Sequence, residues 1–152
     1  MAIGDHVGDC VKIDTAAAAS ILGVAKVHAH TLGHHRVQGD VDILSCDYEG
    51  EGADFFSPTL TYVVETPTIS NPAAQISAEY SGMVAAEHPG LQSFATKIGD
   101  ESVGWVGSNR SNKFKAQITF RTASKVVEVS VDNMPSSADA TTAAQRAAAA
   151  LQ

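Results

Sequence analysis

The sequence predicts an α+β domain, a twisted antiparallel sheet with helices packed on it, and three observations lead to this fold class. Apolar and polar residues alternate strictly over 113–121 and 126–131, which is the period of strands with one buried and one wet face. Helical patterns flank runs of several strands rather than alternating with single strands. The 152 residues, 44% hydrophobic and 18% charged, suit one globular domain, residues 1–152.

The first half of the chain predicts one short helix followed by three strands. Residues 13–23 form the expected helix, because Asp14 or Thr15 can accept hydrogen bonds from its first N–H groups. Gly23 supplies the left-handed residue that ends it. Strands are expected at 24–30, 41–48 and 59–65. A polar loop that runs through Gly39 separates the first two of them.

The second half predicts a helix, four strands and a last helix. Asn71 and Pro72 are typical of a helix start, and helical spacing of apolar residues continues to about residue 88. Weaker strand candidates lie at 91–98 and 103–106, before the alternating hairpin. An Ala-rich helix over 140–151 has a stripe of small residues that would pack closely on the sheet. The predicted order is therefore α-β-β-β-α-β-β-β-β-α.

Charge and hydropathy exclude two classes of partner. The net charge is −7 and the Lys and Arg residues are scattered, whereas a nucleic-acid or anionic-membrane surface needs clustered positive charge. Apolar runs stay well short of the roughly 20 residues that span a bilayer. The first residues lack the basic and apolar regions of a signal peptide, so for an exported protein we expect that the native leader has been removed.

Two cysteines, Cys10 and Cys46, are the most informative residues of the chain. In a small domain such a pair indicates one disulfide and therefore an exported, secreted or cell-surface protein. A disulfide that closes a loop of roughly 36 residues would add about 3.5–4 kcal/mol to the free energy of unfolding. The alternative is a pair of buried free thiols in a protein that was never exported.

Four histidines, His28, His30, His34 and His35, form a candidate metal site. The first two are spaced to share one face of a strand, and the other two follow a glycine that could fold the chain back. Neutral imidazoles placed in this way could bind zinc, copper or nickel. The alternative is a polar, pH-sensitive surface.

Three aromatic residues are candidate ligand contacts. Trp105 lies between Gly104 and Gly107, which could open space beside it, and Tyr62 lies on the apolar face of a strand. Phe56 follows another phenylalanine in a loop, where two adjacent aromatic side chains cannot both point inward. We expect these three to line a groove between sheet and helices, with packing in the core as the alternative for Trp105 and Tyr62.

Several short motifs occur in the order found in a known family. They are the Cys10 segment with its helix start and its Leu22-Gly23 stop, the Cys46-x-Tyr48 spacing, the turn at 99–101, and the closing hairpin with its Ala-rich helix. In these the chain resembles actinobacterial secreted lipoproteins of unknown function. The resemblance implies a cell-envelope protein with its two cysteines paired, reaching the membrane only through a lipid anchor on a leader that this chain lacks. It brings no catalytic residues with it.

The function expected from the sequence is non-catalytic, namely ligand binding or sensing at the cell envelope. Signatures of nucleophilic and nucleotide-dependent enzymes are absent from the sequence, and no cofactor is expected. The expected partner is a small apolar ligand or an envelope protein. Two alternatives are metal binding by the histidine cluster and a small hydrolase, in which a Ser or Cys would lie against His88 or a clustered histidine.

Overall fold

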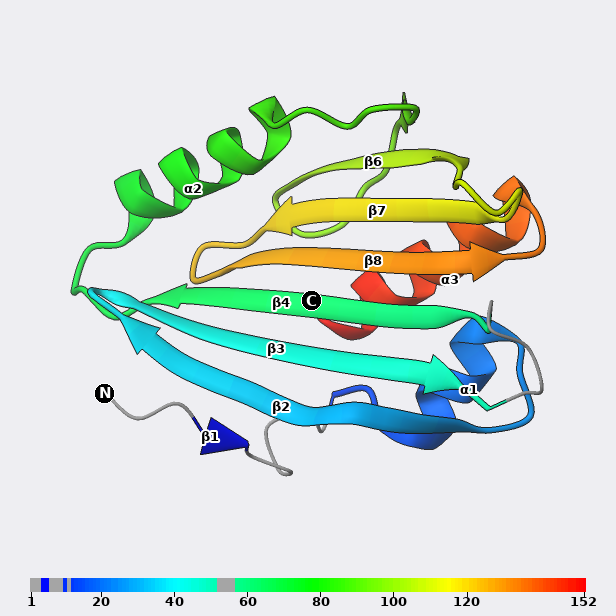
Figure 1. Cartoon of the computed structure of the whole chain (residues 1–152). Coiled ribbons are helices and arrows are strands. Elements are labelled where there is room, and N and C mark those ends of the chain that lie inside the picture. Colours follow the sequence, from blue (N-terminus) through cyan, green and yellow to red (C-terminus); the bar gives the residue numbers. More distant parts are fainter. Residues whose placement is uncertain (1–3, 6–9, 11, 52–56) are drawn as a thin grey trace.

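A computed structural model describes residues 4–5, 10, 12–51 and 57–152, with the backbone alone for 4–5 and 29–38 (Figure 1). Within these residues the helices are α1 (Thr15–Leu22), α2 (Ala73–Ala85) and α3 (Ser137–Ala150). The strands are β1 (Gly4–Asp5), β2 (Val27–Gln38), β3 (Val41–Gly50), β4 (Thr59–Pro67), β5 (Gln92–Phe94), β6 (Glu101–Ser108), β7 (Phe114–Arg121) and β8 (Val126–Met134). The predicted α+β class and element order are confirmed, with the two-residue β1 added in front.

All strands pair antiparallel in one sheet of order β1-β2-β3-β4-β8-β7-β6-β5. The sheet consists of two three-stranded meanders, β2–β4 and β6–β8, with the short β1 and β5 at its two edges. Their last strands lie side by side, with Leu60 of β4 opposite Val131 of β8 and Tyr62 opposite Val129. Figure 1 shows β4 and β8 at the middle of the sheet, so the joint between the two halves of the chain lies in the core.

The inner face of the sheet carries the main core and is covered by α1 and α3, which lie behind the strands in Figure 1. Strand alternation directs Cys46, Tyr62 and Phe120 to this face, and each is at most 1% exposed. The predicted stripe of small residues on α3 is buried against the sheet. Alanine side chains let the helix approach closely, which explains how an Ala-rich helix can close this core.

Helix α1 begins and ends as its sequence predicts. The Asp14 carboxylate accepts a hydrogen bond from the N–H of Ala17 at 2.7 Å, and Gly23 has φ = 69°. Its N–H donates to the carbonyl of Ser20. An isolated helix of eight residues is unstable in water, so α1 depends on its packing against the sheet and α3.

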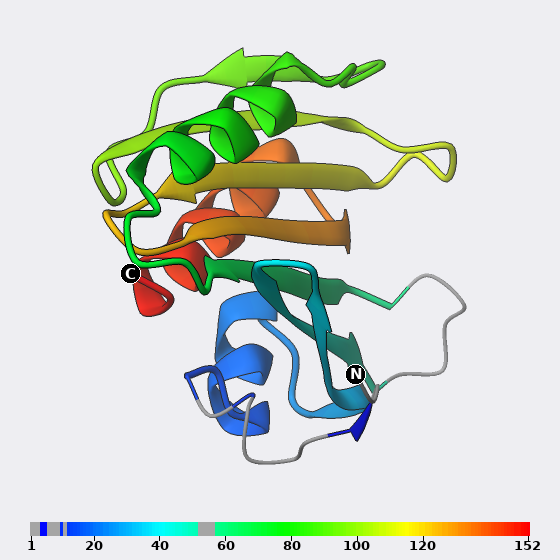
Figure 2. The same ribbon diagram turned by 90° about the vertical axis from the view of Figure 1, so that its left-hand side faces the viewer.

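Helix α2 lies on the outer face, opposite α1 and α3. Its Ile76 and Tyr80 pack against Val126 in a small cluster separate from the main core. Val126 and Val127 are adjacent on β8 and point to opposite faces, which places the two clusters on the two sides of the sheet. Figure 2 shows α2 alongside the β6–β8 half, away from β2 and β3. We expected Asn71 at the N-cap and Pro72 as the first helical residue, but Pro72 is the N-cap of α2, so the helix begins one position later than predicted.

Strand β2 corrects the prediction for this part of the chain. We expected a strand over 24–30 and a loop up to Gly39, but the backbone stays paired with β3 from Val27 to Gln38 and turns only at 39–40. The pairing register shifts twice, between Ala29 and Thr31 and between Thr31 and His34. Each shift leaves an extra residue in β2, as β-bulges do, so the irregular sequence is absorbed without ending the strand.

The predicted Cys10–Cys46 disulfide is confirmed, with the two Cα atoms 6.1 Å apart. It attaches the segment before α1 to the inner face of β3. Tyr48, two residues beyond Cys46, points to the same face, and its hydroxyl donates a hydrogen bond to the carbonyl of Ile13. The same hydroxyl is 3.4 Å from the Cys10 carbonyl oxygen. The Cys-x-Tyr spacing thus gives this segment one covalent and one hydrogen-bonded attachment.

Removing the disulfide should strongly destabilise the fold. For the double variant Cys10→Ala/Cys46→Ala we expect the free energy of unfolding to fall by about 3.5–4 kcal/mol, because the unfolded chain regains the entropy of a 36-residue loop. Urea denaturation of the oxidised protein and the variant measures the difference. A loss below about 1 kcal/mol would contradict the structural role given to this bond.

Candidate functional site

Tyr62, predicted to line a groove, lies instead in the main core. It is 1% exposed on the inner face, and its ring is stacked near that of Tyr48, with centroids 6.3 Å apart. Burial raises the pKa of Tyr62 far above its usual value, and the neighbouring Tyr48 raises it further. The pKa of Tyr48 is also raised, mainly by burial. Tyr62 thus packs in the core beside Tyr48 rather than at a surface.

Trp105 lies on the outer face of β6, and it is 7% exposed. The space that its neighbouring glycines leave is filled by the chain itself. A Cβ at Gly104 would overlap the ring of Phe94, and one at Gly107 would overlap the carbonyl oxygen of Gly90. The glycines therefore allow close approach of β5 and of the segment before it, not of a ligand.

His88 covers the outer side of Trp105. The two rings are nearly parallel, 8° apart in orientation, with centroids 3.7 Å apart. His88 lies two residues after Ala86, the C-cap of α2, so the position at which this helix ends places the imidazole beside Trp105. Trp105 thus supports the His88 ring from beneath and is not itself an open contact for a ligand.

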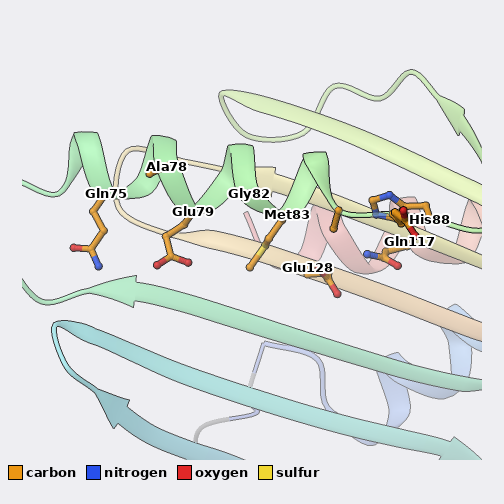
Figure 3. A pocket seen from close by; sticks show the side chains of 10 residues that line it. Gln75, Ala78, Glu79, Gly82, Met83, His88, Gln117 and Glu128 are labelled. Carbon is orange, nitrogen blue, oxygen red and sulfur yellow. The ribbon is translucent and has the colours of Figure 1, made fainter.

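A groove of about 660 Å³ runs between α2 and the outer face of β7 and β8. Figure 3 shows Glu79 and Met83 projecting from α2 toward the sheet, where Glu128 lies. The lining residues are Gln75, Ala78, Glu79, Gly82, Met83, Ala86, Glu87, His88, Gln117 and Glu128. We call this the α2 groove.

The α2 groove continues into a second hollow of about 470 Å³ beyond the end of the helix. Glu87, His88 and Gln117 line both parts and therefore mark their junction. The second part, which we call the distal groove, is also lined by Pro89, Leu91, Ser108, Asn109, Arg110, Lys115 and Asp132. His88, stacked on Trp105, thus stands where the two hollows of the outer face adjoin.

The alternation of apolar and polar residues predicts which residues of the sheet line this groove. Gln117 and Glu128 occupy wet-face positions of the β7–β8 hairpin, as the alternation predicts, and α2 covers part of that face. The groove itself was not predicted, because no local sequence pattern indicates that α2 lies on the face opposite α3.

The remaining predicted site residues lie largely outside the described residues. Phe56 falls among residues 52–56, and the side chains of His30, His34 and His35 are not described. The backbone register pairs His28 with Glu49 and His34 with Ser45, so these two histidines are separated by four residues of β3, roughly 13 Å.

His28 is the one clustered histidine whose side chain is described. It is exposed, and its Nδ1 lies 3.5 Å from a carboxylate oxygen of Glu51. Among the side chains that the structure describes, no group of three or more His, Cys, Asp or Glu could hold a metal ion. Metal binding by the full cluster stays a prediction.

Comparison with known proteins gives no relative. No family model matches the chain, and neither a curated protein nor a solved structure matches it. In the part of the chain that the structure describes, no helix is long and apolar enough to cross a membrane. The site must therefore be interpreted from its own geometry.

The buried tyrosines predict a loss of stability at alkaline pH. The pKa values of Tyr48, Tyr62 and Tyr80 are raised in the folded state, because burial favours the neutral phenol. The stability that these neutral side chains contribute is therefore fully present below the unfolded pKa of about 10, and it is lost as the pH rises toward the folded pKa. Each can lower the free energy of unfolding by up to about 1.4 kcal/mol per pH unit.

Urea denaturation at several values above pH 10 measures this slope. Tyr62→Phe should make it shallower, because one of the titrating groups is gone. Tyrosines that ionise in the native protein at their ordinary pKa would contradict the burial seen here.

His88→Ala should uncover Trp105. Since Trp105 is the sole tryptophan, intrinsic fluorescence reports on it alone. We expect a red-shifted emission maximum and stronger quenching by acrylamide in the variant, with little change in stability because His88 is itself part-exposed. Glu87→Ala, which leaves the stacked pair intact, is the matched control. Unchanged quenching in His88→Ala would show that something other than His88 covers the indole.

Proposed function

We propose that this chain is a non-catalytic binding or sensing module of the cell envelope or the secreted fraction, with its ligand in the α2 groove. The observation that carries the proposal is the groove itself. Its volume of about 660 Å³ lies within the roughly 300–1,000 Å³ of small-molecule sites. It combines charged and amide side chains with an aromatic pair at its junction, which is the mixed lining that gives orientation as well as contact.

The proposed location rests on the disulfide. A bond between Cys10 and Cys46 persists in oxidising compartments, which favours an exported protein over a cytosolic one. Kinship with the actinobacterial lipoproteins, and a lipid anchor on a leader, are parts of the same proposal and rest on sequence motifs. Mass measurement of protein from its native host, without reductant, tests the location: two free thiols would overturn it.

Binding is favoured over the hydrolase alternative by the state of His88. Its ring lies face to face with Trp105 at 3.7 Å and forms part of the wall of the groove. This is an arrangement for packing and recognition. The ligand is also expected to be polar in part, because Glu79, Glu87 and Glu128 line the groove; the purely apolar ligand expected from the sequence fits this lining poorly.

Gly82 allows a clean test of the groove. It lies within α2, lines the groove, and has no atom within 4 Å of where a Cβ would stand. Gly82→Trp should therefore fill the groove without disturbing the fold. Gly82→Ala is the control and should raise the free energy of unfolding by about 0.5–1 kcal/mol through helix propensity.

Heteronuclear NMR titration with a panel of short peptides, polyamines, sugars, nucleotides and fatty acids measures binding. We expect at least one class to shift the amide signals of α2, Gln117 and Glu128 in the native protein and in Gly82→Ala, and not in Gly82→Trp. A panel without any binder, or shifts that persist in Gly82→Trp, would overturn the assignment of the site.

A further inference from the structure

The charge of the lining changes along the channel formed by the α2 groove and the distal groove. The α2 groove has three carboxylates, Glu79, Glu87 and Glu128, and no Lys or Arg among its lining residues. The distal groove contains both cations of the channel, Arg110 and Lys115, together with the shared Glu87 and with Asp132. A ligand that lies along the channel therefore meets only negative charges in the α2 groove and meets the two cations beyond the His88 junction.

These charges are available to a ligand. Within the described part of the chain, none of the three carboxylates forms an ion pair, and neither do Arg110 and Lys115. The distal acid Asp132 is engaged differently. Its Oδ1 accepts hydrogen bonds from the side-chain amide of Asn109 at 2.9 Å and from the N–H of Asn133 at 2.8 Å.

The middle of the channel is suited to amide groups. Gln117 is part-buried, lines both parts, and uses neither its side-chain donors nor its acceptor in a hydrogen bond within the described residues. An amide side chain can donate to a carbonyl and accept from an N–H, which is what a peptide backbone requires of its site. From Glu79 to Ala86 the lining of α2 extends roughly 10 Å, the span of about three extended residues, so a peptide that also reaches Arg110 and Lys115 in the distal groove must be longer than this.

We propose that the channel binds a short peptide with free termini. Its ammonium group lies in the α2 groove on the side of Glu79 and Glu128, its carboxylate lies at Arg110 and Lys115, and its backbone passes Gln117. Complementary charges at the two ends fix the direction of the peptide. This inference rests on the proposed function, because it gives a ligand class to the same site.

The test uses an alanine–serine pentapeptide in four forms: free, N-acetylated, C-amidated, and blocked at both ends. These forms differ only in their terminal charges. NMR titration of the full chain, with Trp105 fluorescence as a second signal, gives the affinities. We expect the free form to bind best and each blocked terminus to weaken binding about two- to fivefold, as expected for partly exposed charge pairs.

Charge-neutralising variants show which end of the site each terminus occupies. Glu79→Gln/Glu128→Gln should weaken the free and C-amidated peptides about two- to fivefold and leave the acetylated peptide unchanged. Lys115→Gln should weaken the free and acetylated peptides and leave the amidated peptide unchanged. Asp139→Asn, an exposed change on α3 at the opposite face, is the matched control and should alter none of them.

The outcomes separate this inference from the proposed function. Equal affinity for all four peptides, or the reverse pattern in the two variants, overturns the peptide orientation. If no pentapeptide binds while another compound binds in a manner that Gly82→Trp abolishes, the peptide class is wrong and the α2 groove remains the site. If nothing binds in a Gly82-dependent manner, both proposals fail.

Discussion

The attachment of Cys10 and Ile13 to the inner face of β3 is the constraint on which the rest of the structure depends. The disulfide holds Cys10 against Cys46, and the Tyr48 hydroxyl holds the carbonyl of Ile13. Helix α1 follows at once and is too short to be stable alone, so this attachment places it over β2–β4. From there α1 meets α3, where the Arg146 guanidinium donates to the carbonyl of Ser20 at 3.2 Å. The attachment to one strand thus places α1 beside α3, and the two helices together cover the inner face of the sheet.

Much of the fold could be predicted because its strongest signals are local. Alternation over β7 and β8 fixes both strands and their wet face, and Asp14 and Gly23 fix the ends of α1. Strand β2 could not be predicted to its full length, since its histidines and Gly33 carry little strand preference. Its conformation is decided by pairing with β3, a partner that no local pattern reveals.

The candidate site was harder to predict, because it is made by elements whose relative placement the sequence leaves open. Glu79 belongs to a helix, His88 to the segment after it, and Gln117 and Glu128 to neighbouring strands. They meet only because α2 lies on the face opposite α3. Trp105 was identified from its glycine neighbours, yet those glycines serve Phe94 and Gly90, and the indole joins the site through the His88 ring. The glycine neighbours of Trp105 thus identified a residue near the site, but the reason given for its importance, open space for a ligand, was wrong.

The joint between the two meanders has a consequence for how the chain reaches its native state. Leu60 of β4 faces Val131 of β8 across 71 positions of sequence, whereas β7 and β8 are joined by a turn of only four residues, 122–125. Contacts of such high order make assembly slow. During synthesis β4 remains an open edge until β8 emerges, and an unpaired strand edge invites association with other chains. The C-terminal hairpin therefore covers a strand edge that would otherwise stay open to other chains.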